Sequence, residues 1–415
     1  MFLKGASSKY KAKAIIIIIV GFLTMYCSGM FGTDIINVIQ NPIMEELGCS
    51  ATAAVMGWSI AGYTLLFATF FFSSFIMKWG AHKFATISFA IMAFGAILVG
   101  VGFGSKSVVI ISIGGLLLRN FAVALQTCMF QLVAGWFNKT RGFVLGILGA
   151  AFALDNSTSS TGLTMLYKNL GFGGMIAVAT SVMVVIGLVT LIFLRSTPEE
   201  CGLTIDGVES DEVAGKAENS EGDHFASNWT LKRFLMTKES WFLGITIGVF
   251  NLTLTGVVTQ FFNSMTAMGV EQSACMGYMV VFGLLGIVMS PIYGKIVDKF
   301  GAPKTGVIAA VLYALSVAGF CFNIPILGAL GLTFFVGAPI LQPALTIHIY
   351  GAKEYQAVNR FSSVVISIIG AFAVPFMTVI YDLTGAYSLA YQILLVLNII
   401  ALICMLLCKK SYANE

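Results

Sequence analysis

Four ionisable side chains lie within long apolar runs of this 415-residue chain: Asp34, Arg119, Asp155 and Arg360. A charge inside a membrane is costly, so each of these residues is a functional candidate by default. Arg119 lies about three residues, roughly 4–5 Å at 1.5 Å per residue, from the centre of the run 107–136. At that depth its guanidinium needs an anion.

Asp155 is the first candidate partner for Arg119. It lies near the middle of the next run, 142–166, which should pack antiparallel beside 107–136 and hold its carboxylate at a similar depth. One interpretation is a static ion pair between the two residues. The other is that Arg119 receives an anionic substrate, while Asp155 releases it or carries a proton. Substrate competition for Arg119 would then couple anion movement to proton movement.

Uncharged polar residues extend this candidate site. Gln126 follows the deep arginine by seven residues and shares its helix face. In the run 14–38, Tyr26, Thr33 and Asn37 follow helical spacing, with Asp34 beside them. Because Asp34 lies toward the outer end of its run, it is either a solvated residue at the mouth or a binding or proton site.

Two further polar groups have a structural interpretation of equal weight. The segment 156–161, just after Asp155, is rich in hydroxyl and amide groups that either line a cavity or pack helices. Asn251, Gln260 and Gln342 in the second half of the chain could bond substrate oxygens or neighbouring helices. We include these three among the predicted substrate-binding residues.

The composition requires a membrane to position these residues. Of the residues, 58% are hydrophobic and 10% are charged, so the sequence predicts an all-α polytopic membrane protein. The candidate spans are about 14–38, 53–76, 84–104, 107–136, 142–166, 173–194, 241–263, 274–296, 305–322, 325–346, 360–381 and 388–408.

The charge distribution sets the expected topology. With both termini in the cytoplasm, most of the 23 Lys and Arg residues fall on the cytoplasmic side, as the positive-inside rule predicts. The net charge of +4 then reflects topology and not a nucleic-acid patch. We expect an N-terminal six-helix bundle at 1–194, a mobile cytoplasmic linker at 195–240 and a C-terminal six-helix bundle at 241–415.

A short basic loop occurs twice and indicates an internal duplication. The two copies, 221 positions apart, are Lys78-Trp79-Gly80-Ala81-His82-Lys83 and Lys299-Phe300-Gly301-Ala302-Pro303-Lys304. The same offset maps Arg360 onto Lys139, in a cytoplasmic connection, so Arg360 is expected to be a helix-end anchor. Arg119, Asp155 and Asp34 map onto uncharged residues, which places the buried charge chemistry in the first half alone.

The second copy, extended upstream to Gly294, resembles the G-x-x-x-D-[RK]-x-G-x-x-[RK] loop of the major facilitator superfamily. The resemblance implies twelve helices in two pseudo-symmetric six-helix bundles and secondary transport by alternating access. Gly294 would let two helices approach closely, and Asp298 would accept bonds from a neighbouring helix end. The first copy departs from the pattern at Ser73 and Met77. The predicted gating-loop residues are Lys78, Gly80, Lys83, Gly294, Asp298, Lys299, Gly301 and Lys304.

Three further segments, 135–142, 197–203 and 381–387, resemble the branch of oxalate:formate antiporters and monocarboxylate transporters. That branch carries cavity cations in the eighth and eleventh helices, and this chain has none at mid-depth there. Since two cations suit a dianion, a single deep arginine favours a monoanion or a zwitterion over oxalate.

These features predict a secondary transporter that moves a small organic anion, a monocarboxylate, by proton coupling or exchange. The expected partners are that anion, the lipid bilayer and protons, with no nucleic acid, and the chain is expected to act as a monomer. The resemblance and the compact loops favour a plasma membrane, specifically a bacterial inner membrane. An efflux transporter of amphiphilic compounds, suggested by 34 Phe and 19 Met, and a non-transporting membrane sensor are the alternatives.

An enzyme is not expected. The three histidines lie at or beyond the ends of spans, no H-E-x-x-H motif is present, and the eight cysteines show no metal-binding spacing. The chain also lacks a G-x-x-x-x-G-K-[ST] phosphate loop. We therefore expect no cofactor and no metal.

Overall fold

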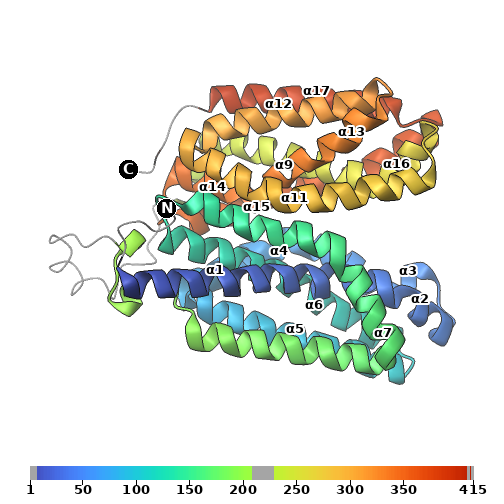
Figure 1. The fold of residues 1–415 in the computed structure, drawn as a ribbon, viewed down its shortest axis with the longest axis horizontal. Coiled ribbons are helices and arrows are strands. Elements are labelled where there is room, and N and C mark those ends of the chain that lie inside the picture. Colours follow the sequence, from blue (N-terminus) through green and yellow to red (C-terminus); the bar gives the residue numbers. More distant parts are fainter. Residues whose placement is uncertain (1–6, 208–228, 409–411, 413–415) are drawn as a thin grey trace. The chain divides into compact units, whose positions relative to one another are not determined.

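The computed structural model describes residues 7–207, 229–408 and Tyr412, and Figure 1 shows its ribbon. The described residues form helices and turns without any strand. They divide into two compact units, 1–139 with 154–226 (unit 1) and 140–153 with 227–415 (unit 2). This outcome confirms the predicted all-α fold class.

Unit 1 begins with one long helical stretch that changes its hydrogen-bonding pattern partway. The π-helical turn η1 (Met30–Asp34) separates α1 (Ser8–Gly29) from α2 (Ile35–Leu47). The α5 and α6 helices pack along each other (Figure 1), and α4 and α1 also pack on α6. The remaining bounds are α3 Ala51–Ala54, α4 Met56–Trp79, α5 Ala81–Gly104, α6 Val108–Trp136, α7 Arg141–Phe193, η2 Glu199–Cys201 and η3 Ile205–Gly207.

Unit 2 contains the first turns of α7 and the helices from α8 onward. In it, α12 packs along α17, and α9 packs on α15 and α17. The bounds are α8 Leu231–Met236, α9 Lys238–Thr259, α10 Phe261–Ala267, α11 Gln272–Phe300, α12 Ala302–Cys321, α13 Pro325–Gly331, η5 Leu332–Gly337, α14 Ala338–Tyr350, α15 Tyr355–Ala371, α16 Ala373–Thr384 and α17 Ser388–Leu407.

Helices occupy all twelve predicted spans, but fewer than twelve of these helices are long and apolar enough to cross a membrane. Among the described residues, 8 helices are long and apolar enough to cross a membrane, or up to 10 if two bent pairs count as spans. The qualifying stretch of α7 is Thr161–Phe193, which covers the predicted span 173–194 and only the end of the predicted span 142–166. The span 360–381 does not qualify because it is divided between α15 and α16, of 17 and 12 residues.

The duplicated loop has the same backbone conformation in both copies. Gly80 has φ 82° and ψ 154°, between α4 and α5, and Gly301 has φ 83° and ψ 155°, between α11 and α12. Both glycines have a positive φ, a backbone conformation that residues with a side chain rarely adopt. The repeat inferred from sequence therefore corresponds to a repeated helix–turn–helix geometry.

The start of the predicted linker is anchored within unit 1. The indole Nε1 of Trp136 donates to the carbonyl of Arg195 at 2.9 Å, and the carboxylate of Asp206 accepts from the N–H groups of Asn138 and Lys139, each at 3.0 Å. The expected mobility of the linker therefore does not extend to 195–207. Its described far end contains the short helix α8.

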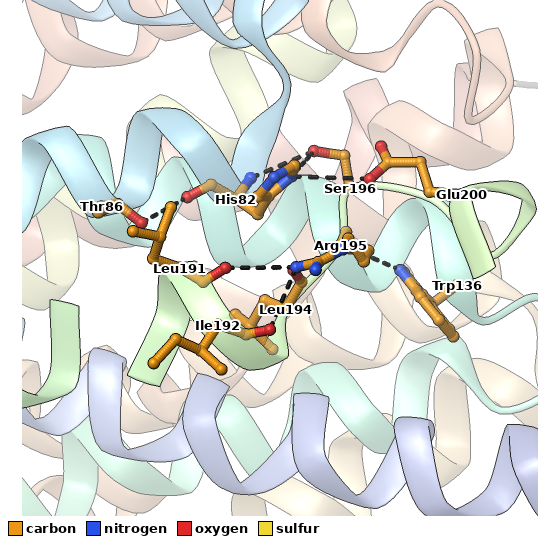
Figure 2. Close-up of polar contacts among 9 residues, drawn as sticks. All are labelled: His82, Thr86, Trp136, Leu191, Ile192, Leu194, Arg195, Ser196 and Glu200. Atoms are coloured by element: carbon orange, nitrogen blue, oxygen red, sulfur yellow. Dashed lines mark hydrogen bonds and ion pairs between the residues drawn. The ribbon is translucent and has the colours of Figure 1, made fainter. Parts of the chain in front are cut away.

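A polar cluster adds to this anchoring at the start of α5, as Figure 2 shows. The Ser196 hydroxyl lies 2.9 Å from Nδ1 of His82 and accepts from the His82 N–H at 3.2 Å. Oε2 of Glu200 lies 3.9 Å from the same ring nitrogen. Burial raises the pKa of the Glu200 carboxyl, against the opposing effects of the Ser196 backbone and Arg195. The cluster fixes the chain after α7 to the loop that contains Gly80.

We predict that Gly301→Ala lowers the stability of the protein by about 1–3 kcal/mol, because φ 83° with ψ 155° is a backbone conformation open essentially to glycine alone. Gly62→Ala is the matched control, since Gly62 is helical and a Cβ there would meet nothing within 4 Å. Thermal melting in detergent measures both variants. Equal melting temperatures for Gly301→Ala and the wild type would contradict the argument.

Candidate functional site

In unit 1, one hydroxyl lies between the half-buried carboxylate of Asp34 and the main chain of Asp155. The hydroxyl of Ser159, on α7, donates to Oδ2 of Asp34 at 2.6 Å and lies 2.6 Å from the carbonyl oxygen of Asp155. Asp155 and Ser159 are four residues apart and therefore share a helix face. Asp155 is 3% exposed and Ser159 is fully buried. The negative charge of Asp34 acts on Asp155 through space.

The π-helical turn η1 explains why Asp34 reaches α7. Tyr26 also faces α7, where its hydroxyl lies 2.9 Å from Oγ1 of Thr158. In an uninterrupted α-helix, positions eight apart lie on different faces and positions seven apart share one. A π-helical turn takes up one additional residue, so Asp34 replaces Thr33 on the face of Tyr26. Thr33 and Asn37, the other two residues of the predicted stripe, are exposed.

Arg119 lies on α6 with an unsatisfied donor. Its Nε is buried and has no hydrogen-bond partner, and no ion pair within 4.0 Å joins Arg119 to Asp155 or Asp34 in the part of the chain that the structure describes. Asp34 still acts on Arg119 electrostatically. The static ion pair between Arg119 and Asp155 therefore does not form in this structure. The guanidinium keeps a donor that can bind an anion.

Asp155 has an unsatisfied hydrogen-bond acceptor. Its Oδ1 is buried without a hydrogen-bond partner among the described residues. The carboxylate lies against Gly29 at the end of α1, where a Cβ would collide with it. Gly29 thus makes the space that this carboxylate occupies. This role could not be predicted, since nothing in the local sequence distinguishes Gly29 from the other glycines.

Gln126 joins α6 to α1 near these residues. Its Nε2 donates to the hydroxyl of Ser28 at 3.3 Å, and that hydroxyl donates to the carbonyl of Met25 at 2.8 Å. Ser28 is fully buried. Unit 1 therefore brings together Tyr26, Asp34, Gln126 and Asp155 around α1 and η1, with Arg119 within electrostatic range of Asp34. Ser28 was not predicted, and Ser159 lies in the hydroxyl-rich segment after Asp155.

Two of the three predicted polar residues of unit 2, Gln260 and Gln342, are bonded to neighbouring side chains. Oε1 of Gln260 accepts from the Tyr387 hydroxyl at 3.1 Å, and Nε2 of Gln342 donates to Oδ1 of Asn359 at 3.4 Å. Asn251 is half-buried on α9. These contacts match the helix-packing interpretation of Gln260 and Gln342 more closely than the substrate-binding one.

Arg360 lies in the second turn of α15, which begins at Tyr355. Its Nε donates to the carbonyl of Ala357 at 3.2 Å, and its guanidinium lies 4.6 Å from the centre of the Phe361 ring. These local contacts occupy the side chain near the start of its helix.

The second copy of the duplicated loop caps a helix. Oδ1 and Oδ2 of Asp298 accept from the N–H groups of Gly142 and Phe143, each at 2.7 Å, at the N-terminus of α7. A Cβ on Gly294 would collide with the backbone of Gly142. A carboxylate at a helix N-terminus is stabilised by the helix dipole and by the free N–H groups. The four predicted loop lysines, Lys78, Lys83, Lys299 and Lys304, are exposed.

Comparison with known proteins places this chain among transport proteins. The model of the Major Facilitator Superfamily matches residues 17–348. The human organic anion transporter MFSD10 has a similar structure, with a TM-score of 0.69, 13% identity and coverage of 94% of this chain and 99% of that one. The proton:xylose symporter XylE has a TM-score of 0.71, 12% identity and coverage of 98% of each chain.

Two other similar proteins extend the comparison. The E. coli fucose:proton symporter FucP has a TM-score of 0.67, 12% identity and coverage of 94% and 98%. A protein of Arabidopsis thaliana named "Putative glycerol-3-phosphate transporter 1" is 36% identical over 91 residues, which are 21% of this chain and 17% of that protein. The three solved structures, all at low identity, establish the fold.

We predict that Asp298→Asn destabilises the protein by about 0.5–1 kcal/mol, because an amide has a single acceptor oxygen and cannot accept charge-assisted hydrogen bonds from the N–H groups of both Gly142 and Phe143. Glu271→Gln is the matched control, since Glu271 is exposed and makes no side-chain hydrogen bond as N-cap of α11. Thermal melting in detergent compares the two. The capping role is refuted if both variants melt at the wild-type temperature.

Proposed function

The chain belongs to the major facilitator superfamily and is therefore a membrane transporter rather than an enzyme, and from this premise we propose that it carries a small organic anion. The proposed cargo is a monocarboxylate. Arg119 is the residue that receives the carboxylate. Transport is secondary and proceeds by alternating access, driven by an ion gradient or by exchange.

The unsatisfied Nε of Arg119 is the observation that carries this proposal. A buried donor without a partner costs free energy, and a carboxylate is the group that a guanidinium binds with charge-assisted hydrogen bonds. The substrate carboxylate would accept the hydrogen bond from Nε of Arg119. Tyr26 and Gln126, which lie on the neighbouring elements, could contact the remainder of a small molecule.

The names of similar proteins agree with an anionic cargo. One similar structure is named as an organic anion transporter, and the partial relative from Arabidopsis is named for glycerol-3-phosphate, also an organic anion. Two other similar structures are named as proton symporters of sugars. Arg119 is what favours an anion over a sugar for this chain, because a neutral sugar would leave the buried cation unpaired.

The charges of unit 1 favour movement of a cation with the anion. With Arg119, Asp34 and Asp155 all ionised, their sum is negative, and a bound monoanion makes it more negative. A cation that binds at the same time lowers this electrostatic cost. We therefore propose Asp34 and Asp155 as the ion-coupling residues, with the proton as the ion expected from sequence. The setting that we propose is the plasma membrane, with both termini in the cytoplasm and a monomeric carrier.

Uptake of radiolabelled monocarboxylates into proteoliposomes tests the role of Arg119. We expect Arg119→Gln to lower uptake about tenfold or more, because truncating one partner of a buried charge pair costs about 2 kcal/mol or more. Lys168→Gln, which removes an exposed positive charge from α7, should transport like the wild type. Both variants should still insert into the membrane.

Two results would contradict the proposal. Unchanged carboxylate uptake by Arg119→Gln would remove Arg119 from the substrate site. Binding of carboxylate by the wild type without accumulation inside the vesicles would identify a sensor.

A further inference from the structure

The carboxylate of Asp155 has an oxygen for which the fold provides no donor. Its side chain is 3% exposed, and Oδ1 has no hydrogen-bond partner among the residues that the structure describes. Buried polar atoms are nearly always hydrogen-bonded, because an unpartnered one keeps the full cost of leaving water. The cost is larger for an ionised carboxylate. This atom is therefore suited to bind a positively charged ligand.

Oxygen atoms from η1 and α7 lie together around Ser159. The Ser159 hydroxyl lies 2.6 Å from Oδ2 of Asp34 and 2.6 Å from the main-chain oxygen of Asp155. A hydroxyl has a single hydrogen, so it donates to one of these atoms at a time and keeps lone pairs for a cation. The negative charge of Asp34 adds to that of Asp155. These hard oxygen ligands suit an alkali or alkaline-earth cation.

The net charge of the ionisable residues around this position favours a monovalent cation. Arg119, Asp34 and Asp155 together carry one net negative charge when ionised, which one monovalent cation neutralises and a divalent cation would reverse. No group of three or more His, Cys, Asp and Glu residues that could hold a metal ion was found in the described part of the chain. Two carboxylates with a hydroxyl form a smaller ligand set, which fits a weakly bound ion.

We propose that Asp34, Ser159 and Asp155 form a sodium site. A proton would carry the same charge, but it binds to a single oxygen, whereas a metal cation is bound by several oxygen ligands together. Here the group that Asp34 contacts is the Ser159 hydroxyl, which provides an additional oxygen ligand for an ion. Gly29 shapes the site, because only a residue without a side chain lets the Asp155 carboxylate lie against the end of α1.

The role of sodium as the driving ion rests on the proposed function, whereas its binding does not. A substrate carboxylate at Arg119 would weaken the pull of the guanidinium on Asp34. Asp34 and Asp155 would then attract a cation more strongly, and by linkage the cation would favour the anion. Anion and sodium would move together.

Sodium binding to the purified full-length protein tests the site directly. The measurements are 22Na⁺ binding by scintillation proximity and the melting temperature in NaCl, KCl or choline chloride at constant pH and ionic strength. The wild type should bind 22Na⁺ saturably and be stabilised by Na⁺ more than by K⁺ or choline. Ser159→Ala and Asp155→Asn should weaken Na⁺ binding by about tenfold or more. Ser181→Ala and Glu45→Gln, which change exposed residues of α7 and α2, should bind like the wild type.

Arg119→Gln separates this inference from the proposed function. It should lose carboxylate uptake and still bind Na⁺ at least as tightly as the wild type, because the variant removes a positive charge that acts on Asp34. Loss of uptake without loss of Na⁺ binding therefore supports both proposals, and unchanged uptake with intact Na⁺ binding overturns the proposed function alone.

Three results would overturn the sodium site. The first is equal stabilisation by Na⁺, K⁺ and choline in the wild type. The second is wild-type Na⁺ affinity in correctly folded Ser159→Ala and Asp155→Asn. The third is stabilisation by lower pH that depends on Asp155 and is indifferent to Na⁺, which would identify a proton site.

Discussion

The buried charges of unit 1 impose the constraint on which the rest of this structure depends. Arg119 and Asp155 each keep one buried atom without a hydrogen-bond partner, and Asp34 interacts electrostatically with both. If these residues served stability alone, Nε of Arg119 would be expected to donate to the carboxylate of Asp155. Their separation stores electrostatic free energy that ligands of opposite charge can release, so this arrangement suits binding and release better than permanent structure.

The local geometry serves this separation. The η1 turn rotates Asp34 onto the face of Tyr26, Gly29 opens space beside α1 for the Asp155 carboxylate, and Ser159 connects the two acids. The Trp58 indole donates to the carbonyl of Gly32 at 3.2 Å, which holds one carbonyl of the π-helical turn. An alanine at position 29 would displace the carboxylate without changing any charge. The site thus depends on backbone shape as much as on ionisable groups.

The sequence predicted the features that follow from composition and periodicity. Apolar runs located the helices, and the repeated glycine loop predicted two turns that have nearly identical dihedral angles at Gly80 and Gly301. The depth of Arg119 and Asp155 within their runs identified them as candidates. The sequence could not reveal the π-helical turn, because α-helical spacing was the only available rule and it placed Thr33, with Asp34 beside it, on the face of Tyr26. It also could not show that Gln260 bonds Tyr387, since that contact joins residues 127 positions apart.

NMR of 15N-arginine-labelled protein observes Nε of Arg119, the atom at which we propose that the carboxylate binds. The Arg119 Nε–H signal is the one lost in Arg119→Gln. On titration with a small monocarboxylate, we predict a saturable shift of this signal, and no shift with the corresponding amide, which lacks the charge. A titration that saturates transport while leaving the Arg119 signal unmoved would contradict it.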